Sequence, residues 1–406
     1  MSLVSPVSTK RSTKRAVALT TALVTSLTTA AVLATAQPGQ AAANTQHSCA
    51  TAQAGQAACL AIVRTDRQMT RAQAAAALAA PSGYGPSQIQ SAYKLSGLNA
   101  SGRTVAIVDA YDDPTAEADL GVYRSQFGLP ACTTANGCFR KISQTGTTTY
   151  PAKNGGWAQE ISLDLDMVSA ACPTCHILLV EANTASFANL GTAVNRAAGA
   201  AGVVAISNSY GGSDAPDSTY GHYYNHPGIA VTASTGDGGY QGGSFPADSA
   251  YAVAVGGTSL RTASSSRGWS ETAWSGAGSG CSAYNAALAA AASFNTGCSK
   301  RAMADVSAVA DPQTGVAVYD STRYQGRSGW LVFGGTSASS PIIASVYALS
   351  GNTSGYPSAL PYQHASSLFD VTSGSNGSCS PSQLCHARSG WDGPTGLGTP
   401  NGTAGF

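Results

Sequence analysis

Five short apolar runs, each of strand length and apolar on both faces, constrain the fold more than any other feature of the sequence. They are residues 103–110, 176–181, 203–207, 229–233 and 250–255. Strands that bury both faces are typical of a parallel sheet covered by helices. Helical patterns follow at 114–127, 157–171, 187–200 and 337–349. Because strands and helices alternate, the sequence predicts an α/β fold with helices on both sides of the sheet.

The first 43 residues have the composition of an export signal. Four basic side chains within residues 10–15 precede the apolar run Ala16–Ala36, and Ala41–Ala43 supplies the small residues of a cleavage site. A membrane anchor is the alternative, but many Thr and Ser residues lower the hydrophobicity of this run. We therefore expect a signal peptide at 1–43, a secreted protein, and no stable membrane association after cleavage.

Three further features concern organisation and partners. Residues 44–83 are rich in Ala and Gln, with a short helix expected at 69–79, and we interpret them as a short leader or propeptide-like linker. Residues 262–325 are rich in Gly and Ser, and we expect irregular surface loops there. The 21 Lys and Arg against 20 Asp and Glu give a net charge of +1, which excludes a basic field for nucleic acid.

All ten cysteines follow the first 43 residues and fall as neighbours along the chain. An even number in an exported chain indicates disulfides, and the simplest pairing is sequential. That pairing is Cys49–Cys59, Cys132–Cys138, Cys172–Cys175, Cys281–Cys298 and Cys379–Cys385. The alternative is that Cys172 and Cys175 form a redox motif or half of a zinc site, but a second C-x-x-C is missing.

Three short segments carry residues suited to catalysis. Ser337, in the sequence G-G-T-S-A, opens an apolar helix, where the helix dipole favours developing negative charge. A plain helix cap is the alternative. Glu160 and Asp164 are four residues apart on a helix, so they share one face; a solvated acidic face is the other interpretation. Asp237 follows an expected strand, where it could be catalytic or an ordinary turn residue.

No histidine stands beside these segments in a pattern that suggests a Ser-His-Asp site. A serine nucleophile would therefore need a carboxylate as its base. A carboxylate stays ionised at low pH, where histidine is already protonated, so such a site would indicate acid conditions.

An ordered set of motifs from residue 84 to the C-terminus resembles the sedolisins, the serine-carboxyl peptidases. The motifs are Glu160-x-x-x-Asp164, S-x-S-x-G at 207–211, T-G-D-G-G at 235–239, F-P-A at 245–247, A-V-G-G-T-S-L at 254–260, G-G-T-S-A at 334–338 and G-W-D-x-x-T-G-L-G at 390–398. The resemblance implies one catalytic domain at 84–406, with a subtilisin-like parallel sheet flanked by helices.

The resemblance also implies a role for each catalytic position. Ser337 matches the nucleophile, Glu160 its general base, and Asp164 the acid that orients Glu160. Asp237 matches the donor of the oxyanion hole, and Asp109 an acid behind the catalytic pair. The resemblance implies a serine-type endopeptidase that cuts proteins or peptides, and we expect a monomer. Glu160 as base and protonated Asp237 as donor predict a bell-shaped, acidic pH profile.

The C-terminal motif matches the family's site for one structural calcium ion (Ca²⁺). The resemblance implies the side chains of Asp370 and Asp392 and the backbone carbonyls of Val371, Arg388 and Gly390 as ligands. Hard oxygen ligands in a Gly-rich loop suit calcium. Sedolisins usually carry a long folded propeptide, whereas only residues 44–83 are available for that role in this sequence.

Three alternatives to a secreted acid endopeptidase stay open. A tripeptidyl exopeptidase of the same family would share every residue above. A catalytically silent binding scaffold would be expected to lack Ser337 or Glu160, and both are present. A neutral hydrolase that depends on a histidine such as His222 is the remaining alternative.

Overall fold

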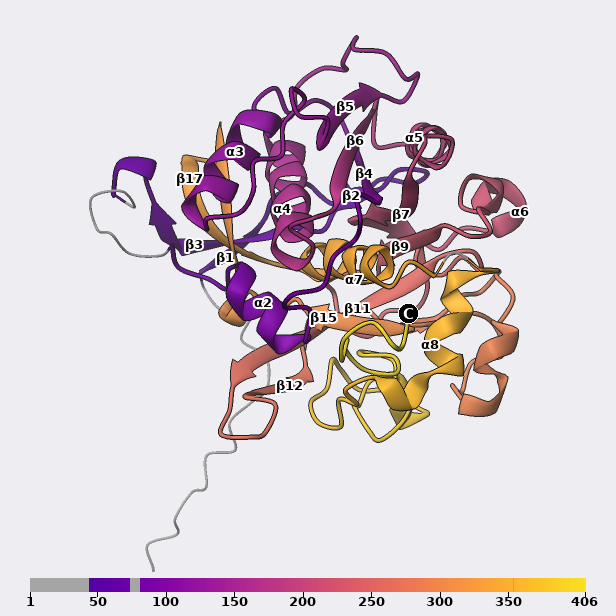
Figure 1. Ribbon diagram of the computed structural model, residues 1–406. Helices are drawn as coiled ribbons and strands as arrows, with labels where there is room; N and C mark the ends of the chain where they lie inside the picture. Colours follow the sequence, from indigo (N-terminus) through magenta and orange to yellow (C-terminus); the bar gives the residue numbers. More distant parts are fainter. Residues whose placement is uncertain (1–43, 74–80, 353) are drawn as a thin grey trace, which may run out of the picture. The chain divides into compact units, whose positions relative to one another are not determined.

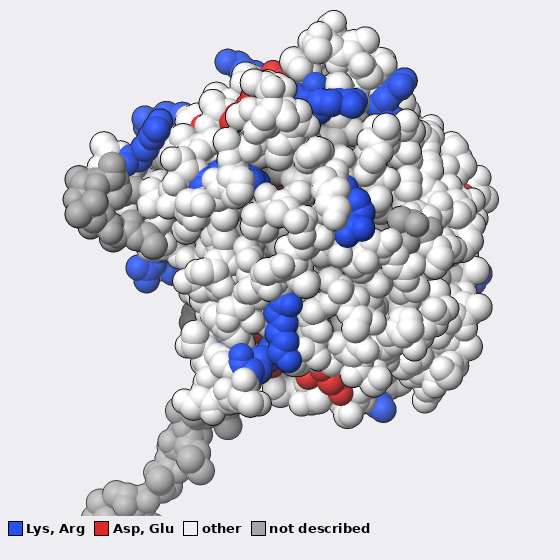
Figure 2. All heavy atoms as spheres, viewed as in Figure 1, with Lys and Arg blue, Asp and Glu red and all other residues white. Residues whose placement is uncertain are grey.

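The computed structural model describes residues 44–73, 81–352 and 354–406, all within one compact unit, Ala41–Phe406. The predicted signal peptide at 1–43 lies outside the described residues. None of the helices in the described part of the chain is long and apolar enough to cross a bilayer. On the face that Figure 2 shows, Lys and Arg side chains are scattered in separate groups rather than gathered in one stripe.

A large sheet in the order β12-β11-β9-β7-β4-β6-β5 forms the centre of the unit, and β15 also pairs with β11 (Figure 1). The strands are β4 (Thr104–Ala110), β5 (Phe139–Ser143), β6 (His176–Ala182), β7 (Val203–Asn208), β9 (Ala230–Ser234), β11 (Val253–Thr262), β12 (Trp269–Ala273) and β15 (Val306–Val309). All pair in parallel except β12, which is antiparallel to β11. The predicted α/β fold is confirmed.

Helices cover both faces of this sheet, as the apolar strands predict. Alternate residues of β4 point to opposite faces, as the period of two in a strand requires. Val105 and Ile107 join the core cluster that includes α4 (Gly155–Ala171) and α7 (Thr336–Ser350). Ala106 and Val108 join the other cluster, which includes α5 (Phe187–Ala198). The remaining helices are α2 (Pro86–Ala92), α3 (Ala116–Gln126), α6 (Asp217–Tyr220) and α8 (Leu360–Gln363).

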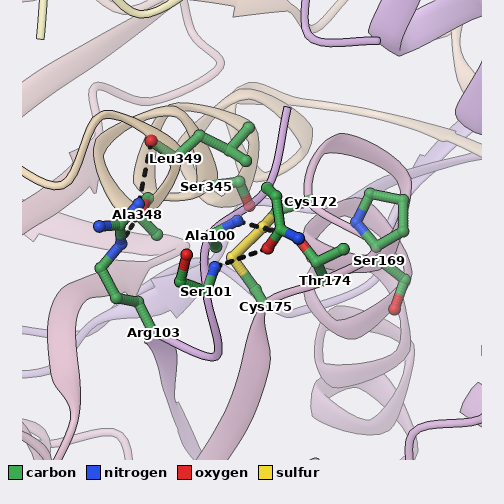
Figure 3. Close-up of a disulfide and its surroundings, with 12 residues drawn as sticks. Ala100, Ser101, Arg103, Ser169, Cys172, Thr174, Cys175, Ser345, Ala348 and Leu349 are labelled. Atoms are coloured by element: carbon green, nitrogen blue, oxygen red, sulfur yellow. Dashed lines mark hydrogen bonds between the residues drawn. A yellow bond between two sulfur atoms is a disulfide. The ribbon is translucent and has the colours of Figure 1, made fainter. Parts of the chain in front are cut away.

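Helices α4 and α7 lie side by side in the core (Figure 1). The Asn154 side chain caps α4 by accepting hydrogen bonds from the backbone N–H groups of Gly156 and Trp157. At the C-terminal end of α7, the Arg103 guanidinium donates hydrogen bonds to the carbonyls of Ala348 (2.6 Å) and Leu349 (3.1 Å) (Figure 3). A cation at a helix C-terminus contributes about 0.3–1 kcal/mol, so Arg103 helps to fix the helix that carries Ser337.

Three smaller sheets complete the fold. A four-stranded sheet has the order β1-β3-β17-β16 and contains β1 (Thr45–His47), β3 (Ile62–Met69), β16 (Val316–Tyr324) and β17 (Arg327–Gly334). A three-stranded sheet joins β10 (Ser244–Phe245), β8 (Tyr210–Ser213) and β2 (Ala58–Cys59). The third pairs β13 (Gly280–Cys281) with β14 (Ala302–Met303).

The smaller sheets also bear on what the sequence predicts for 44–83 and 262–325. In the described part of 44–83, β1, β2 and β3 pair within the sheets, and the role of this segment as a leader or propeptide-like linker stays a prediction. Met69 ends β3, and residues 71–73 are helical, so the expected helix at 69–79 begins later than predicted; residues 74–80 lie outside the described chain. The region 262–325 contains five strands, β12 to β16, rather than only loops, because short apolar runs such as Val306–Val309 interrupt its Gly- and Ser-rich stretches.

The ten cysteines form the five sequential disulfides that the spacing predicts. Cys172 and Cys175 are bonded to each other and fully buried between the end of α4 and the start of β6 (Figure 3). Thr174, between them, accepts a hydrogen bond from the Ala100 N–H at 3.0 Å. This disulfide therefore belongs to the packed core rather than to an open thiol site.

Candidate active site

The carboxyl ends of β4, β7 and β9 and the first turn of α7 bring the predicted catalytic residues together. This edge of a parallel sheet is where α/β folds form their ligand sites. Asp109 lies in β4, Ser209 directly follows β7, and Asp237 lies three residues beyond β9. Ser337 is the second residue of α7, and Gly335, whose φ of 96° favours glycine, directly precedes the helix.

Ser337 is fully buried, and its hydroxyl faces Glu160. The Ser337 Oγ donates a hydrogen bond to the Glu160 Oε2 at 2.9 Å and also lies 3.2 Å from the backbone carbonyl oxygen of Ser209. The same Glu160 oxygen accepts the backbone N–H of Ala61 at 2.8 Å. Neither partner of the serine hydroxyl is a histidine, so the nearest candidate base is a carboxylate.

Asp164 lies one turn after Glu160 on α4, as the spacing predicts, and is also fully buried. Its Oδ1 accepts a hydrogen bond from the Ser209 hydroxyl at 2.7 Å, and its Oδ2 has no hydrogen-bond partner. The structure therefore places Asp164 against Ser209 rather than in a hydrogen bond with Glu160. Asp109 is buried beside them, and neither of its carboxyl oxygens has a hydrogen-bond partner.

Burial and mutual repulsion make the three carboxyl groups hard to ionise together. Burial raises the pKa of Asp109 to about 8. Burial, with the charge of Asp109 next in importance, raises the pKa values of Glu160 and Asp164 well above their usual range. Two donors point at Glu160, one at Asp164 and none at Asp109. Hydrogen bonds stabilise the charged form, so the two donors at Glu160 favour its ionised form, whereas burial and the charge of Asp109 oppose it.

Asp237 is held by the residue that precedes Ser337. Its Oδ1 accepts hydrogen bonds from the Thr336 N–H at 2.7 Å and from the Thr336 hydroxyl at 2.9 Å. Its Oδ2 has no hydrogen-bond partner. Burial raises the pKa of Asp237 to about 7, so below that pH this carboxyl is neutral. Because Oδ1 must accept from Thr336, the proton resides on Oδ2, which is then a donor.

A cleft of about 540 Å³ opens next to these residues. Its lining includes Gly211 and Gly212 of β8, Asp237 with the glycines after it, and Leu60 of the N-terminal segment. Sequence reasoning missed the contributions of Leu60, Ala61 and Ser209. Ser209 lies within the S-x-S-x-G motif and could have been singled out, whereas no local pattern indicated that Leu60 and Ala61 reach this site.

The five predicted calcium ligands lie together in the C-terminal loops. The backbone N–H of Gly390 donates to Asp370 at 3.0 Å, and that of Arg388 donates to Asp392 at 3.1 Å. These bonds tie the loop that carries Asp370 to the loop that carries Asp392. No group of three or more His, Cys, Asp or Glu side chains among the described residues is arranged to hold a metal. The predicted set needs only two carboxylates and is completed by backbone oxygens.

Comparisons with known proteins indicate the family of this chain, although no protein-family model matches it. The chain is 32% identical to kumamolisin of Bacillus sp. over 80% of its own length and 63% of kumamolisin. It is 43% identical to a tripeptidyl-peptidase of Arthroderma otae over 16% of its length and 11% of that protein.

Among solved structures, Pseudomonas sedolisin, a serine-carboxyl proteinase complexed with pseudo-iodotyrostatin, superposes with a TM-score of 0.66 and 25% identity. The match covers 79% of this chain and 95% of the sedolisin chain. Against full-length kumamolisin the chain spans less than two thirds of the relative. The chain belongs to the sedolisin family of serine-carboxyl peptidases and has their subtilisin-like fold.

Proposed function

We propose that this protein is a secreted endopeptidase that hydrolyses peptide bonds at acid pH, with Ser337 as nucleophile and Glu160 as its base. One observation carries the proposal: the Ser337 hydroxyl donates to a buried Glu160 oxygen at 2.9 Å, which is the contact that a nucleophile and its base require. Ser337 also lies in the first turn of α7, where the helix dipole stabilises negative charge.

Each of the other acids has a distinct task in this mechanism. Glu160 accepts the serine proton, and the buried Asp164 orients Glu160 and shares its proton, with Asp109 behind this pair. Asp237 in its neutral form donates from Oδ2 to the oxygen of the tetrahedral intermediate. Ionisation of Glu160 sets the acid limb of the pH profile, and loss of the Asp237 proton near pH 7 sets the upper limb.

We also propose that the C-terminal loops bind one calcium ion. Asp370, Asp392 and the carbonyl oxygens of Val371, Arg388 and Gly390 would hold it, because hard oxygen ligands suit this cation. The ion would supply charge neutralisation for the two carboxylates and fix the loops. The described hydrogen-bond partners of Ser337 and Glu160 include none of these ligands, so the role of the ion would be structural. The five disulfides support export to an oxidising compartment.

The test is hydrolysis of an unfolded protein from about pH 3 to about pH 8, with wild type beside Ser337→Ala. We expect an acidic bell-shaped profile that is absent in the variant. A maximum near neutrality would indicate a histidine base and would refute the role of Glu160. Activity retained in Ser337→Ala would refute the nucleophile.

A further inference from the structure

We propose that Ser209 is a positioning residue whose hydroxyl fixes which oxygen of Asp164 carries a proton. The proton lies on the Asp164 Oδ2, the oxygen that can share it with the neighbouring acids Glu160 and Asp109. This inference rests on the proposed function and deepens it, because Asp164 is the acid that shares a proton with Glu160, the base of Ser337.

The Ser209 hydroxyl lies between Asp164 and the helix of the nucleophile. Its Oγ donates to the Asp164 Oδ1 at 2.7 Å and lies 3.3 Å from the backbone carbonyl oxygen of Ser337. All three residues are fully buried. A serine hydroxyl has one proton to donate, and the shorter contact is the one to the carboxyl group. Asp164 is therefore the principal acceptor of this proton.

Pro341 explains why the carbonyl of Ser337 is available to this hydroxyl. In an α-helix the N–H of each residue donates to the carbonyl four residues before it, so residue 341 would donate to residue 337. Residue 341 lies inside α7 and is a proline, which has no N–H. The Ser209 hydroxyl thus has one acceptor on α4 and one on α7, and it fixes Asp164 relative to the helix of the nucleophile.

Donation by Ser209 determines the tautomer of Asp164. A protonated carboxyl group carries its proton on one oxygen, and the other oxygen is the better acceptor. Because the Asp164 Oδ1 accepts from Ser209, a proton on Asp164 resides on Oδ2. That oxygen is buried and has no hydrogen-bond partner among the described residues. Thr336 acts in the same way on Asp237, where its two donors leave the proton on Oδ2.

The oxygens that can share the Asp164 proton belong to two neighbouring acids. In Glu160 the Oε2 accepts the Ser337 hydroxyl at 2.9 Å, and the Oε1 has no partner in the described chain. Both oxygens of Asp109 likewise have no partner within the described residues. A proton on the Asp164 Oδ2 is therefore available to these oxygens, whereas a proton on Oδ1 would be directed at Ser209.

The carboxyl groups of this site also influence one another through their charges. Burial is the largest cause of the raised pKa of Asp164, and the charges of Asp109 and Glu160 follow. At Glu160 the order is burial and then Asp109, with Asp237 as the weakest cause. The hydrogen bond from Ser209 acts in the opposite direction and lowers the pKa of Asp164. Without that donor, the ionised pair of Asp164 and Glu160 is less stable and loses its first proton at a higher pH.

The experiment measures kcat and KM for one peptide from about pH 3 to about pH 8 in wild type, Ser209→Ala and Ser209→Thr. Ser209→Ala removes the hydroxyl but keeps the backbone carbonyl that lies 3.2 Å from the Ser337 Oγ. We expect its kcat to fall about 10–100-fold with little change in KM, as for loss of one hydrogen bond to a charged group. The midpoint of the acid limb should move up by about 1 pH unit. Ser209→Thr retains a hydroxyl and should restore both values.

Ser207→Ala is the matched control. Ser207 is the first serine of the same S-x-S-x-G motif, lies in β7 and is also fully buried. Among the described residues its hydroxyl contacts the Ser340 Oγ at 2.9 Å and no acid. Both serine hydroxyls therefore contact α7, but only that of Ser209 reaches a carboxyl group. We expect Ser207→Ala to lower the melting temperature and to leave the acid limb in place.

A second variant keeps the test valid if Ser209→Ala does not fold. Ser209→Cys has a similar volume and replaces a strong donor by a weak one, so its acid limb should also move to higher pH. An acid limb in the same place as that of Ser209→Thr would overturn the inference.

Two other outcomes overturn the inference and leave the proposed function intact. One is a Ser209→Ala variant that loses kcat while its acid limb stays in place, because that loss would reflect packing alone. The other is an equal shift of the acid limb in Ser207→Ala. If Ser337→Ala retains activity, or wild type cuts no peptide at any pH, the proposed function fails and this inference with it.

Discussion

Replacing Asp237 by asparagine should preserve the oxyanion donor and abolish its dependence on pH. Thr336 donates two hydrogen bonds to one oxygen of Asp237, at 2.7 and 2.9 Å. In Asp237→Asn the amide oxygen must occupy this position, because only oxygen can accept from the Thr336 N–H. The amide NH₂ group is then placed where Oδ2 stands, facing the developing oxyanion at every pH.

The size of the effect follows from the pKa of Asp237, which burial raises to about 7. Above that value the neutral fraction of the carboxyl falls about tenfold per pH unit. The wild-type rate should fall with it, whereas the rate of Asp237→Asn should not. The ratio of variant to wild-type kcat/KM is therefore expected to rise about tenfold per pH unit above pH 7. Asp237→Ala, which has no donor, should lose about 10²–10³-fold in kcat at all pH values.

The assay is the initial rate of cleavage of one peptide between pH 5 and pH 8, with circular dichroism as a check on folding at each pH. A ratio of Asp237→Asn to wild type that stays constant over this range would refute the oxyanion role of Asp237. Equal losses in Asp237→Asn and Asp237→Ala would show that the proton on Oδ2 is not what the site uses.

Two further predictions concern stability. Asp320 is fully buried, and burial raises its pKa from 3.8 to about 8. Its contribution to the free energy of unfolding is therefore complete below about pH 4 and is lost as pH rises to 8. That shift corresponds to roughly 6 kcal/mol, so the free energy of urea unfolding of Asp320→Asn should depend less on pH from 4 to 8 than that of wild type. Asp66→Asn, at an exposed carboxyl paired with Arg64, is the control and should leave the pH dependence over this interval unchanged. An unchanged pH dependence in Asp320→Asn would contradict the reasoning. Chelation of calcium should lower the melting temperature more than it lowers kcat, and the melting temperature of Asp370→Ala should not fall further when chelator is added. A wild-type melting temperature that does not change with chelator would refute the proposed metal site.

The central sheet could be predicted from the sequence because its strands are buried on both faces. Runs such as 105–108 and 203–206 are continuously apolar, and the structure has β4 and β7 there. The strand Trp269–Ala273 was missed because it lies at the edge of the sheet and carries Ser, Glu and Thr. A sequence pattern of this kind does not differ from that of a surface loop.

The candidate site could be predicted in its residues but not in its contacts. Glu160 and Asp164 share a helix face by spacing alone, and Ser337 follows from its position at a helix start. The place of Asp109 among them depends on which strand lies behind α4, and no local pattern specifies that. The pairing of β2 with β8 joins segments far apart in sequence, so no local pattern predicts it.

The pairing of β3 with β17 also determines when the site can form during folding. Ile62 lies opposite Gly334, and most of the described chain separates them. β17 leads directly into α7, so the strand that pairs with β3 is followed at once by the helix that contains Ser337. Contacts between such distant segments form late, since the chain between them must first be ordered. We therefore expect the pairing of β3 with β17 and the placement of Ser337 to occur in the same late folding step.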